Sequence, residues 1–158
     1  MKNTAVQLYE LGQSVWYDNI RRGLLDNGEL VGMIERGEIY GVTSNPSIFM
    51  KAITKSTDYD DSLDKLKGAE LDPEAVFFVL AIEDIQEAAD LFQSLYEETE
   101  GGDGYVSLEV SPYIANQTEE TIQQAKELWQ RVDRPNLMVK IPATKAGIPA
   151  IEEAIFAG

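Results

Sequence analysis

The sequence predicts an α/β protein in which parallel strands alternate with helices. Four short strand-like runs are each followed by one or more segments with helical periodicity. This strand–helix order, repeated four times, favours parallel βαβ units with right-handed crossovers. The 158 residues suffice for one ordinary domain with its own core, and no linker, repeat or low-complexity tract divides them. We therefore expect residues 1–158 to form a single domain.

Each expected element follows from apolar spacing and from the residues that begin or end it. The expected strands are Gln13–Asp18, Glu38–Ser44, Tyr105–Val110 and residues 135–141. The expected helices are residues 3–12, Asn27–Arg36, Ser47–Ile53, Tyr59–Leu66, 73–98, a helix starting at Thr118 with Trp129 in its apolar stripe, and 147–157. Asp72-Pro73 opens the longest helix because proline is favoured in a first turn. The order Thr-Glu-Glu-Thr from Thr118 is a loose capping signal.

Two architectures fit this order of elements. One is an open doubly wound sheet, and the other is part of a (β/α)8 barrel. No glycine-rich phosphate loop follows the first strand, which weakens the nucleotide-binding version of the open sheet.

Composition excludes several classes of function. The net charge is −15, from 28 acidic and 13 basic residues. Such a surface repels nucleic acid and anionic membranes, so we expect neither as a partner. The sequence has no cysteine and no histidine, so catalysis would depend on Lys, Asp, Glu, Ser, Thr or Tyr. No apolar run approaches the roughly 20 residues of a membrane span and no signal-like segment follows Met1, which makes the cytoplasm the expected compartment.

Lys140 ends the fourth expected strand and is the first candidate for catalysis. Strands of a parallel sheet are covered on both faces, so we expect this lysine to be substantially buried. Burial disfavours the charged ammonium, and a neutral amine in a dry pocket forms a Schiff base with a ketone or aldehyde. The alternative is that Lys140 reaches water from the strand end or pairs with a carboxylate.

All four strands deliver a polar side chain near their carboxyl ends. Alternation places Val106, Leu108 and Val110 against the helices, with Ser107, Glu109 and Ser111 on the opposite face. Applied to every strand, the same rule selects Asp18, Asn45, Glu109 and Lys140. Carboxyl ends of strands are where α/β barrels build active sites.

An amine beside two carboxylates and an amide is a set suited to aldol chemistry. The amine forms the imine, one carboxylate moves the proton of a substrate hydroxyl, and the other positions water. Each residue also has a structural alternative. Asp18 could cap a helix, Asn45 could be a turn residue before Pro46, and Glu109 could be only the ion-pair partner of Lys140.

Two segments resemble the signatures of a known enzyme family. Gly41-Val42-Thr43-Ser44-Asn45-Pro46-Ser47-Ile48-Phe49 resembles the first signature of the transaldolases. Leu137-Met138-Val139-Lys140-Ile141-Pro142-Ala143-Thr144, with Gly147-Ile148, resembles the second, which carries the Schiff-base lysine. Ser107-Leu108-Glu109-Val110-Ser111 and Trp16-Tyr17-Asp18 are similar to the third and first strands of that family. The resemblance extends over essentially the whole chain and is strongest to the longer bacterial transaldolases, some of which are fused to a glucose-6-phosphate isomerase domain.

The resemblance implies a class I aldolase mechanism without a metal or organic cofactor. It would move a dihydroxyacetone unit from a ketose phosphate to an aldose phosphate in the pentose phosphate pathway. Carried over, Lys140 is the nucleophile, Asp18 the acid/base for carbon–carbon cleavage, and Glu109 acts through the catalytic water. Asn45 would hold a substrate hydroxyl, with Thr43 and Ser111 as further substrate-binding partners. A related fructose-6-phosphate aldolase is the alternative enzyme.

The chain is shorter than the (β/α)8 barrel that the resemblance implies. A complete barrel typically takes about 250 residues, so we expect the N-terminal half of a TIM barrel, with four strands. The family's phosphate-gripping Ser and Arg residues belong to its second half, so we expect weak or no activity. Unpaired first and fourth strands favour a homo-oligomer that covers these edges. The competing hypothesis is a non-catalytic half-barrel in which Lys140 is a buried ion-pair partner.

Overall fold

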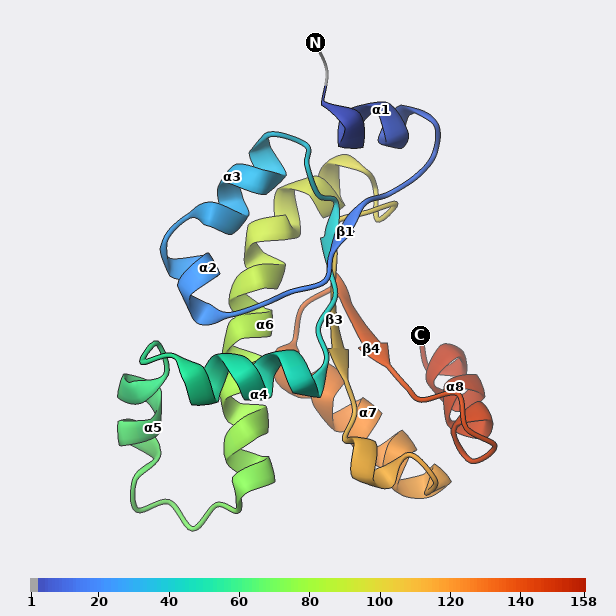
Figure 1. Cartoon of the computed structure of the whole chain (residues 1–158). Coiled ribbons are helices and arrows are strands. Elements are labelled where there is room, and N and C mark those ends of the chain that lie inside the picture. The colour runs from blue at the N-terminus through green and yellow to red at the C-terminus, as the bar shows by residue number, and fades with distance from the viewer. Residues whose placement is uncertain (1–2) are drawn as a thin grey trace.

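The computed structural model describes residues 3–158 and contains one parallel four-stranded sheet in the order β1-β2-β3-β4, with helices packed against it (Figure 1). The strands are β1 (Trp16–Tyr17), β2 (Gly41–Val42), β3 (Tyr105–Glu109) and β4 (Leu137–Lys140). The helices are α1 (Thr4–Glu10), α2 (Arg22–Asp26), α3 (Glu29–Glu35), α4 (Pro46–Lys55), α5 (Asp60–Leu66), α6 (Pro73–Glu98), η1 (Pro112–Ile114, 3-10), α7 (Thr118–Val132) and α8 (Gly147–Phe156). The expected α/β class with parallel units is confirmed, and the sheet is consistent with half of a TIM barrel.

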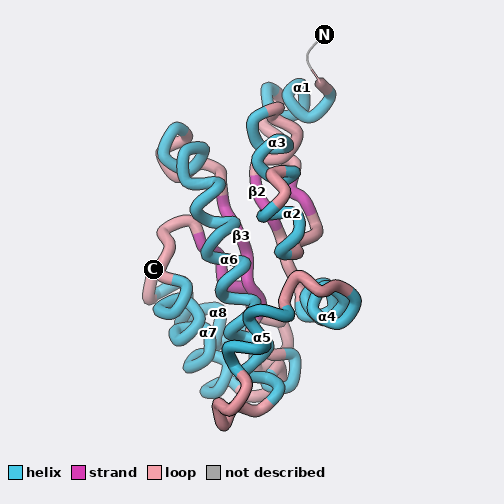
Figure 2. Tube along the Cα trace, turned by 90° about the vertical axis from the view of Figure 1, so that its left-hand side faces the viewer, coloured by secondary structure: helices cyan, strands magenta, loops and turns pink. Residues whose placement is uncertain are grey.

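The core lies between the sheet and the helices. Val106, Leu108 and Val110 are each at most 1% exposed, which confirms the alternation expected for the third strand. They join a cluster to which α6 contributes Ile85 and Phe92. Figure 2, viewed from the side of α2, α3 and α6, shows these helices in front of the strands. Burial of such side chains contributes roughly 1.5–3 kcal/mol each, so the α6–β3 contact is a major source of stability.

The first two strands are shorter than the sequence predicts. The first strand was expected over Gln13–Asp18, but β1 has two residues, and β2 also has two. Gly41 in β2 is needed here, because a Cβ atom at this position would come within 2.5 Å of the Trp16 ring. The aromatic ring of β1 therefore packs directly on the backbone of β2.

Two short helices, α2 and η1, were not predicted from the sequence. α2 has five residues and is separated from α3 by Gly28, which has a left-handed φ of 75°. The 3-10 helix η1 begins at Pro112 directly after β3. Segments of three to five residues are too short to show helical periodicity, which explains why neither was expected.

α7 begins at Thr118 as expected, but the expected cap is wrong. Thr118 does not cap this helix: Gln117 occupies the N-cap position without a side-chain hydrogen bond. The Thr118 hydroxyl instead donates to the carbonyl of Ala146 over 2.8 Å, which ties α7 to the loop before α8. Trp129, expected in the apolar stripe, is 43% exposed. It lies on the side of α7 that faces β4 and the end of the chain, where no further strand covers it among residues 3–158.

A buried polar network joins α2, α5 and α6. Arg22 Nε donates to Asp84 Oδ1 over 2.8 Å, and Tyr59 Oη donates to Asp84 Oδ2 over 2.6 Å. Asp84 is fully buried. Burial raises the pKa of Asp84 to about 6, although hydrogen bonds from Tyr59 and the charge of Arg22 act in the opposite direction. This network fixes α6, the helix on which β3 packs.

None of the helices formed by residues 3–158 is long and apolar enough to cross a membrane.

Candidate active site

Lys140 and Glu109 end neighbouring strands at the same level of the sheet. The register of β3 and β4 pairs the two residues directly, and Lys140 Nζ lies 3.3 Å from Glu109 Oε2. The ammonium also donates to the Ser44 carbonyl over 2.5 Å and to Thr43 Oγ1 over 3.4 Å. The Lys140 side chain is 38% exposed and paired with a carboxylate, so the expected substantial burial is wrong and the alternative for Lys140 is realised. The last residue of an outer strand is open to solvent, and a carboxylate partner stabilises its charge there.

Asp18 follows β1 directly and is exposed. The Thr43 amide donates to the Tyr17 carbonyl over 3.0 Å, so the backbone leading to Asp18 runs alongside Thr43. Arg21, and not Asp18, is the N-cap residue of α2, which removes the capping alternative. Within residues 3–158, no hydrogen bond or ion pair holds the Asp18 carboxylate. It is free to meet a ligand at this end of the sheet.

Asn45 is the N-cap of α4. Its side-chain oxygen accepts a hydrogen bond from the Ile48 amide over 3.0 Å, and Pro46 occupies the first turn. This arrangement fixes the Asn45 side chain at the carboxyl end of β2, between β1 and β3. The cap uses the carbonyl oxygen, and the amide nitrogen makes no hydrogen bond within residues 3–158. Asn45 is therefore a helix cap and not the turn residue given as its alternative, and the cap leaves the amide available to a substrate.

Two serines belong to the Lys140 environment and were not among the predicted site residues. Ser107 Oγ donates to Thr43 Oγ1 over 3.1 Å, and Ser44 Oγ donates to the Ser107 carbonyl over 2.6 Å. Strand alternation already placed Ser107 on the face of Glu109, which was the available signal. Ser44 contacts Lys140 through its backbone carbonyl, so no side-chain pattern could have identified it. We call Thr43, Ser44, Ser107, Glu109 and Lys140 the lysine cluster.

Ser111 has a different environment from the other predicted site residues. It is buried, its hydroxyl accepts a hydrogen bond from the Tyr113 amide over 3.3 Å, and its own amide donates to Gln124 Oε1 over 2.5 Å. These bonds fix the turn after β3 to α7. The structure thus brings Thr43, Glu109 and Lys140 into contact, while Ser111 supports the loop beside them.

Two polar side chains anchor the strand that carries Lys140. Asn136, directly before β4, donates to the carbonyls of Ala89 and Gly104 over 2.8 and 2.9 Å. After β4, Thr144 Oγ1 donates to the Ala115 carbonyl and accepts from the Gly147 amide. A Cβ atom at Gly147 would lie 1.9 Å from the Pro142 carbonyl oxygen, so glycine is required for this close turn. Both ends of β4 are held, which fixes the Lys140 backbone.

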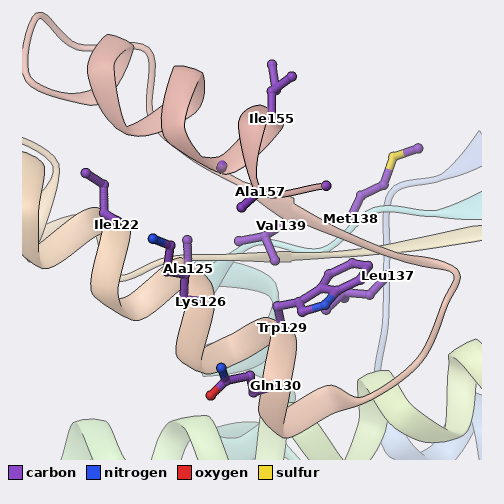
Figure 3. A pocket seen from close by; sticks show the side chains of 12 residues that line it. Ile122, Ala125, Lys126, Trp129, Gln130, Leu137, Met138, Val139, Ile155 and Ala157 are labelled. Carbon is purple, nitrogen blue, oxygen red and sulfur yellow. The ribbon is translucent and has the colours of Figure 1, made fainter.

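One cavity lies away from Lys140. It has a volume of about 610 Å³ and opens between α7, β4 and the end of the chain. Figure 3 shows Trp129 and Ile122 of α7 on one side and Val139 of β4 and Ile155 of α8 around it. We call this the apolar groove. Its lining includes none of the predicted site residues, so it is not the site of the lysine chemistry.

The chemistry available at the lysine cluster is that of an amine beside a carboxylate. No group of three or more Asp or Glu side chains within residues 3–158 is arranged to hold a metal ion. An amine, a neighbouring carboxylate and hydroxyl groups can form an imine and move protons around it.

Comparisons with known proteins identify the family of the chain. The sequence profile of the Transaldolase/Fructose-6-phosphate aldolase family matches residues 15–158. The chain is 47% identical over 150 residues to a transaldolase of Thiobacillus denitrificans, covering 95% of this chain and 42% of that protein. It is 46% identical over 147 residues to a transaldolase of Mycolicibacterium smegmatis, covering 93% of this chain and 40% of that protein. It thus spans about two fifths of the length of these relatives. The chain belongs to the Transaldolase/Fructose-6-phosphate aldolase family.

Proposed function

We propose that this chain carries the Schiff-base half of a transaldolase active site. The reaction is transfer of a dihydroxyacetone unit between sugar phosphates of the pentose phosphate pathway, with Lys140 as the nucleophile. The observation that supports this most is the pairing of Lys140 with Glu109 at the carboxyl ends of β4 and β3. The family match supports the same reaction, since the relatives named above are transaldolases.

In the first step, the Lys140 nitrogen adds to the C2 carbonyl of the ketose phosphate. Of the three protons on the resting ammonium, two pass to the carbonyl oxygen, which leaves as water, and the third stays on the nitrogen to give the protonated imine. Glu109 is 3.3 Å from Lys140 Nζ, which suits it to accept a proton from the amine and to hold the water. Thr43 contacts the same nitrogen, so its hydroxyl lies next to the reacting carbon.

In the second step, Asp18 takes the proton of the C4 hydroxyl. The C3–C4 bond breaks, its electron pair passes into the protonated imine to give an enamine on Lys140, and the aldose phosphate leaves. Asp18 is exposed at the carboxyl end of β1 without a partner in the described chain, which leaves its carboxylate available as the base. The amide of Asn45, next along the rim, would hold a substrate hydroxyl. Addition of the enamine to an acceptor aldehyde and hydrolysis of the imine return the free amine.

A second candidate is a non-catalytic half-barrel. The Lys140 ammonium forms an ion pair with Glu109 and donates hydrogen bonds to two further oxygen atoms. That arrangement also suits a purely structural role. Under either function we propose that residues 1–158 act as one domain and that two copies associate through the outer strands β1 and β4 and the apolar groove.

Cleavage of fructose 6-phosphate tests the proposed function. With sugar in excess over protein, we expect a burst of up to one equivalent of glyceraldehyde 3-phosphate per chain without an acceptor, and continued release only when an acceptor aldehyde is added. Lys140→Ala should abolish release, and the exposed neighbour Lys145→Ala should retain it. Continued release without an acceptor would instead identify a fructose-6-phosphate aldolase. No release from the well-folded chain would support the non-catalytic half-barrel.

A further inference from the structure

Ser107 is a buried polar residue next to the site, with no assigned part in the reaction. It lies in β3 two residues before Glu109, so its side chain points to the same face as Glu109 and Lys140. Only 3% of Ser107 is exposed, which leaves its hydroxyl closed to a ligand. Within residues 3–158, its hydroxyl donates one hydrogen bond, to Thr43 Oγ1 over 3.1 Å. Ser107 therefore acts on the site only through its neighbours.

The hydrogen bonds around Thr43 determine how its hydroxyl is oriented. A hydroxyl group has one proton and two acceptor lone pairs. Thr43 Oγ1 accepts from Ser107 Oγ and from Lys140 Nζ, which occupies both lone pairs. Its own proton must then point away from both donors. Without the Ser107 hydroxyl, Thr43 could rotate, and its contact with the amine would no longer be fixed.

A second connection runs through the backbone of Ser107. Its carbonyl accepts the buried hydroxyl of Ser44 over 2.6 Å, and the Ser44 carbonyl accepts from Lys140 Nζ over 2.5 Å. Ser107 thus contacts both residues by which the end of β2 holds the lysine. Its side chain acts on Thr43, and its backbone acts on Ser44.

We propose that Ser107 is a positioning residue that orients the Lys140 amine for addition to the substrate carbonyl, through the hydroxyl of Thr43. This inference rests on the Schiff-base function proposed above. Ser107 makes and breaks no bond in the reaction. Its effect is on the fraction of time that the amine points at the carbonyl carbon.

The test is a cycle of Ser107→Ala, Thr43→Val and the double variant. The rate of borohydride-trapped imine formation on Lys140 is measured at increasing fructose 6-phosphate. Loss of one positioning hydrogen bond should lower the maximal rate about five- to tenfold, with the half-saturating sugar concentration unchanged. Because Ser107 acts through Thr43, Ser107→Ala should cause no further loss in the Thr43→Val background. Ser107→Cys keeps a weak donor of similar size, so its maximal rate of imine formation should fall less than that of Ser107→Ala. The cysteine variant replaces the alanine variant in the test if the latter does not fold.

A substrate-free measurement separates this inference from the proposed function. In carbon-13 spectra of the lysine ε-methylene groups, a fixed Lys140 gives two distinct proton shifts, and these should merge in Ser107→Ala. Ser62→Ala, a buried serine of the Arg22 network, should leave both the spectrum and the rate unchanged. The proposal is overturned if Ser107→Ala leaves the splitting and the rate unchanged, or if the losses multiply in the double variant. If the wild-type chain forms no imine, the Schiff-base function fails and the spectra alone decide the role of Ser107.

Discussion

Lys140 meets three oxygen acceptors, one from each of Glu109, Ser44 and Thr43. These contacts match the three protons of an ammonium group. The amine must lose protons before it can attack a carbonyl, and the adjacent carboxylate of Glu109 is placed to receive one. At the scale of single residues, the Lys140–Glu109 contact holds the ion pair in the resting protein and also provides the path by which the ammonium loses a proton.

Replacing Asp18 should separate imine formation from carbon–carbon cleavage. Asp18→Asn removes the base but leaves the lysine cluster intact, so we predict a loss of glyceraldehyde 3-phosphate release of about 10²- to 10⁴-fold. Imine formation should continue, and borohydride should then trap the whole six-carbon sugar phosphate on Lys140 instead of a three-carbon unit. Intact-mass spectrometry distinguishes the two adducts. Asp61→Asn, an exposed carboxylate on α5, is the matched control, and a three-carbon adduct in Asp18→Asn would refute this role.

Asp84 makes stability depend on pH. Its pKa is about 6 in the folded chain against an ordinary 3.8, so the folded state binds more protons than the unfolded state between these values. Stability should therefore fall as pH rises through this window, and a shift of about two pKa units corresponds to about 3 kcal/mol. Urea unfolding of wild type and Asp84→Asn at pH 4 to 7 checks this. The free energy of unfolding of wild type, minus that of the variant, should decrease as the pH rises from 4 to 7. A difference that stays constant would contradict the prediction.

At the scale of elements, α4 couples the fold to the site through one side chain. Asn45 caps the helix with its oxygen and leaves its amide nitrogen for a substrate hydroxyl. Asn45→Asp keeps the cap and removes the amide, so we predict nearly unchanged stability with weaker binding of fructose 6-phosphate. Asn45→Ala loses both and should destabilise the chain by about 1 kcal/mol.

Thermal unfolding and the half-saturating sugar concentration for imine trapping measure the two effects. Asp72→Ala, which removes the N-cap of α6 away from the site, is the control for lost capping. It should lower stability by a similar amount without changing the sugar concentration needed. If Asn45→Asp binds the sugar as well as wild type does, Asn45 caps α4 but does not bind the substrate.

Which elements could be predicted depends on their length and their signals. The long helix α6 has an apolar stripe and begins at Pro73, as expected. β1 and β2 were expected with longer bounds, because pairing with neighbouring strands, and not local sequence, decides where a ladder stops. Asp84 was missed because its partners Arg22 and Tyr59 are distant in the sequence, so only the folded chain brings them together.

The site could be predicted in its side chains but not in its backbone contacts. Alternation along β3 and β4 placed Glu109 and Lys140 on one face, and the register confirms that they are neighbours. The sequence left open whether Lys140 is buried or reaches water, because this depends on what covers β4. The contact with the Ser44 carbonyl has no side-chain signature.

At the scale of the whole molecule, the open sheet predicts association between copies. Trp129, Val139 and Ile155 line the apolar groove beside β4, and Trp129 is the largest of them. We predict that static light scattering over a concentration series shows a dimer and that Trp129→Lys weakens it more than tenfold, because aromatic side chains anchor interfaces. Gln123→Lys adds the same charge on α7 outside the groove and should have little effect. A monomeric mass at all concentrations would rule out this association.

The same dimer should respond to salt. Each chain carries a net charge of −15, so two copies repel each other at low ionic strength. Salt screens this repulsion over a Debye length of about 10 Å at 0.1 M. We predict tighter association as sodium chloride is raised from about 0.01 to 0.15 M. Weaker association with salt would show that ion pairs, and not the apolar groove, hold the copies together.

The most direct test of the Lys140 hypothesis is intact-mass spectrometry after incubation with fructose 6-phosphate and borohydride. We predict one three-carbon adduct per chain, mapped to Lys140 by peptide analysis, and its absence in Lys140→Ala. That result would mean that the amine forms an imine and that cleavage proceeds on this four-stranded unit. An adduct on another lysine, or no adduct on the well-folded wild-type chain, would contradict the assignment of Lys140 as the nucleophile of this unit.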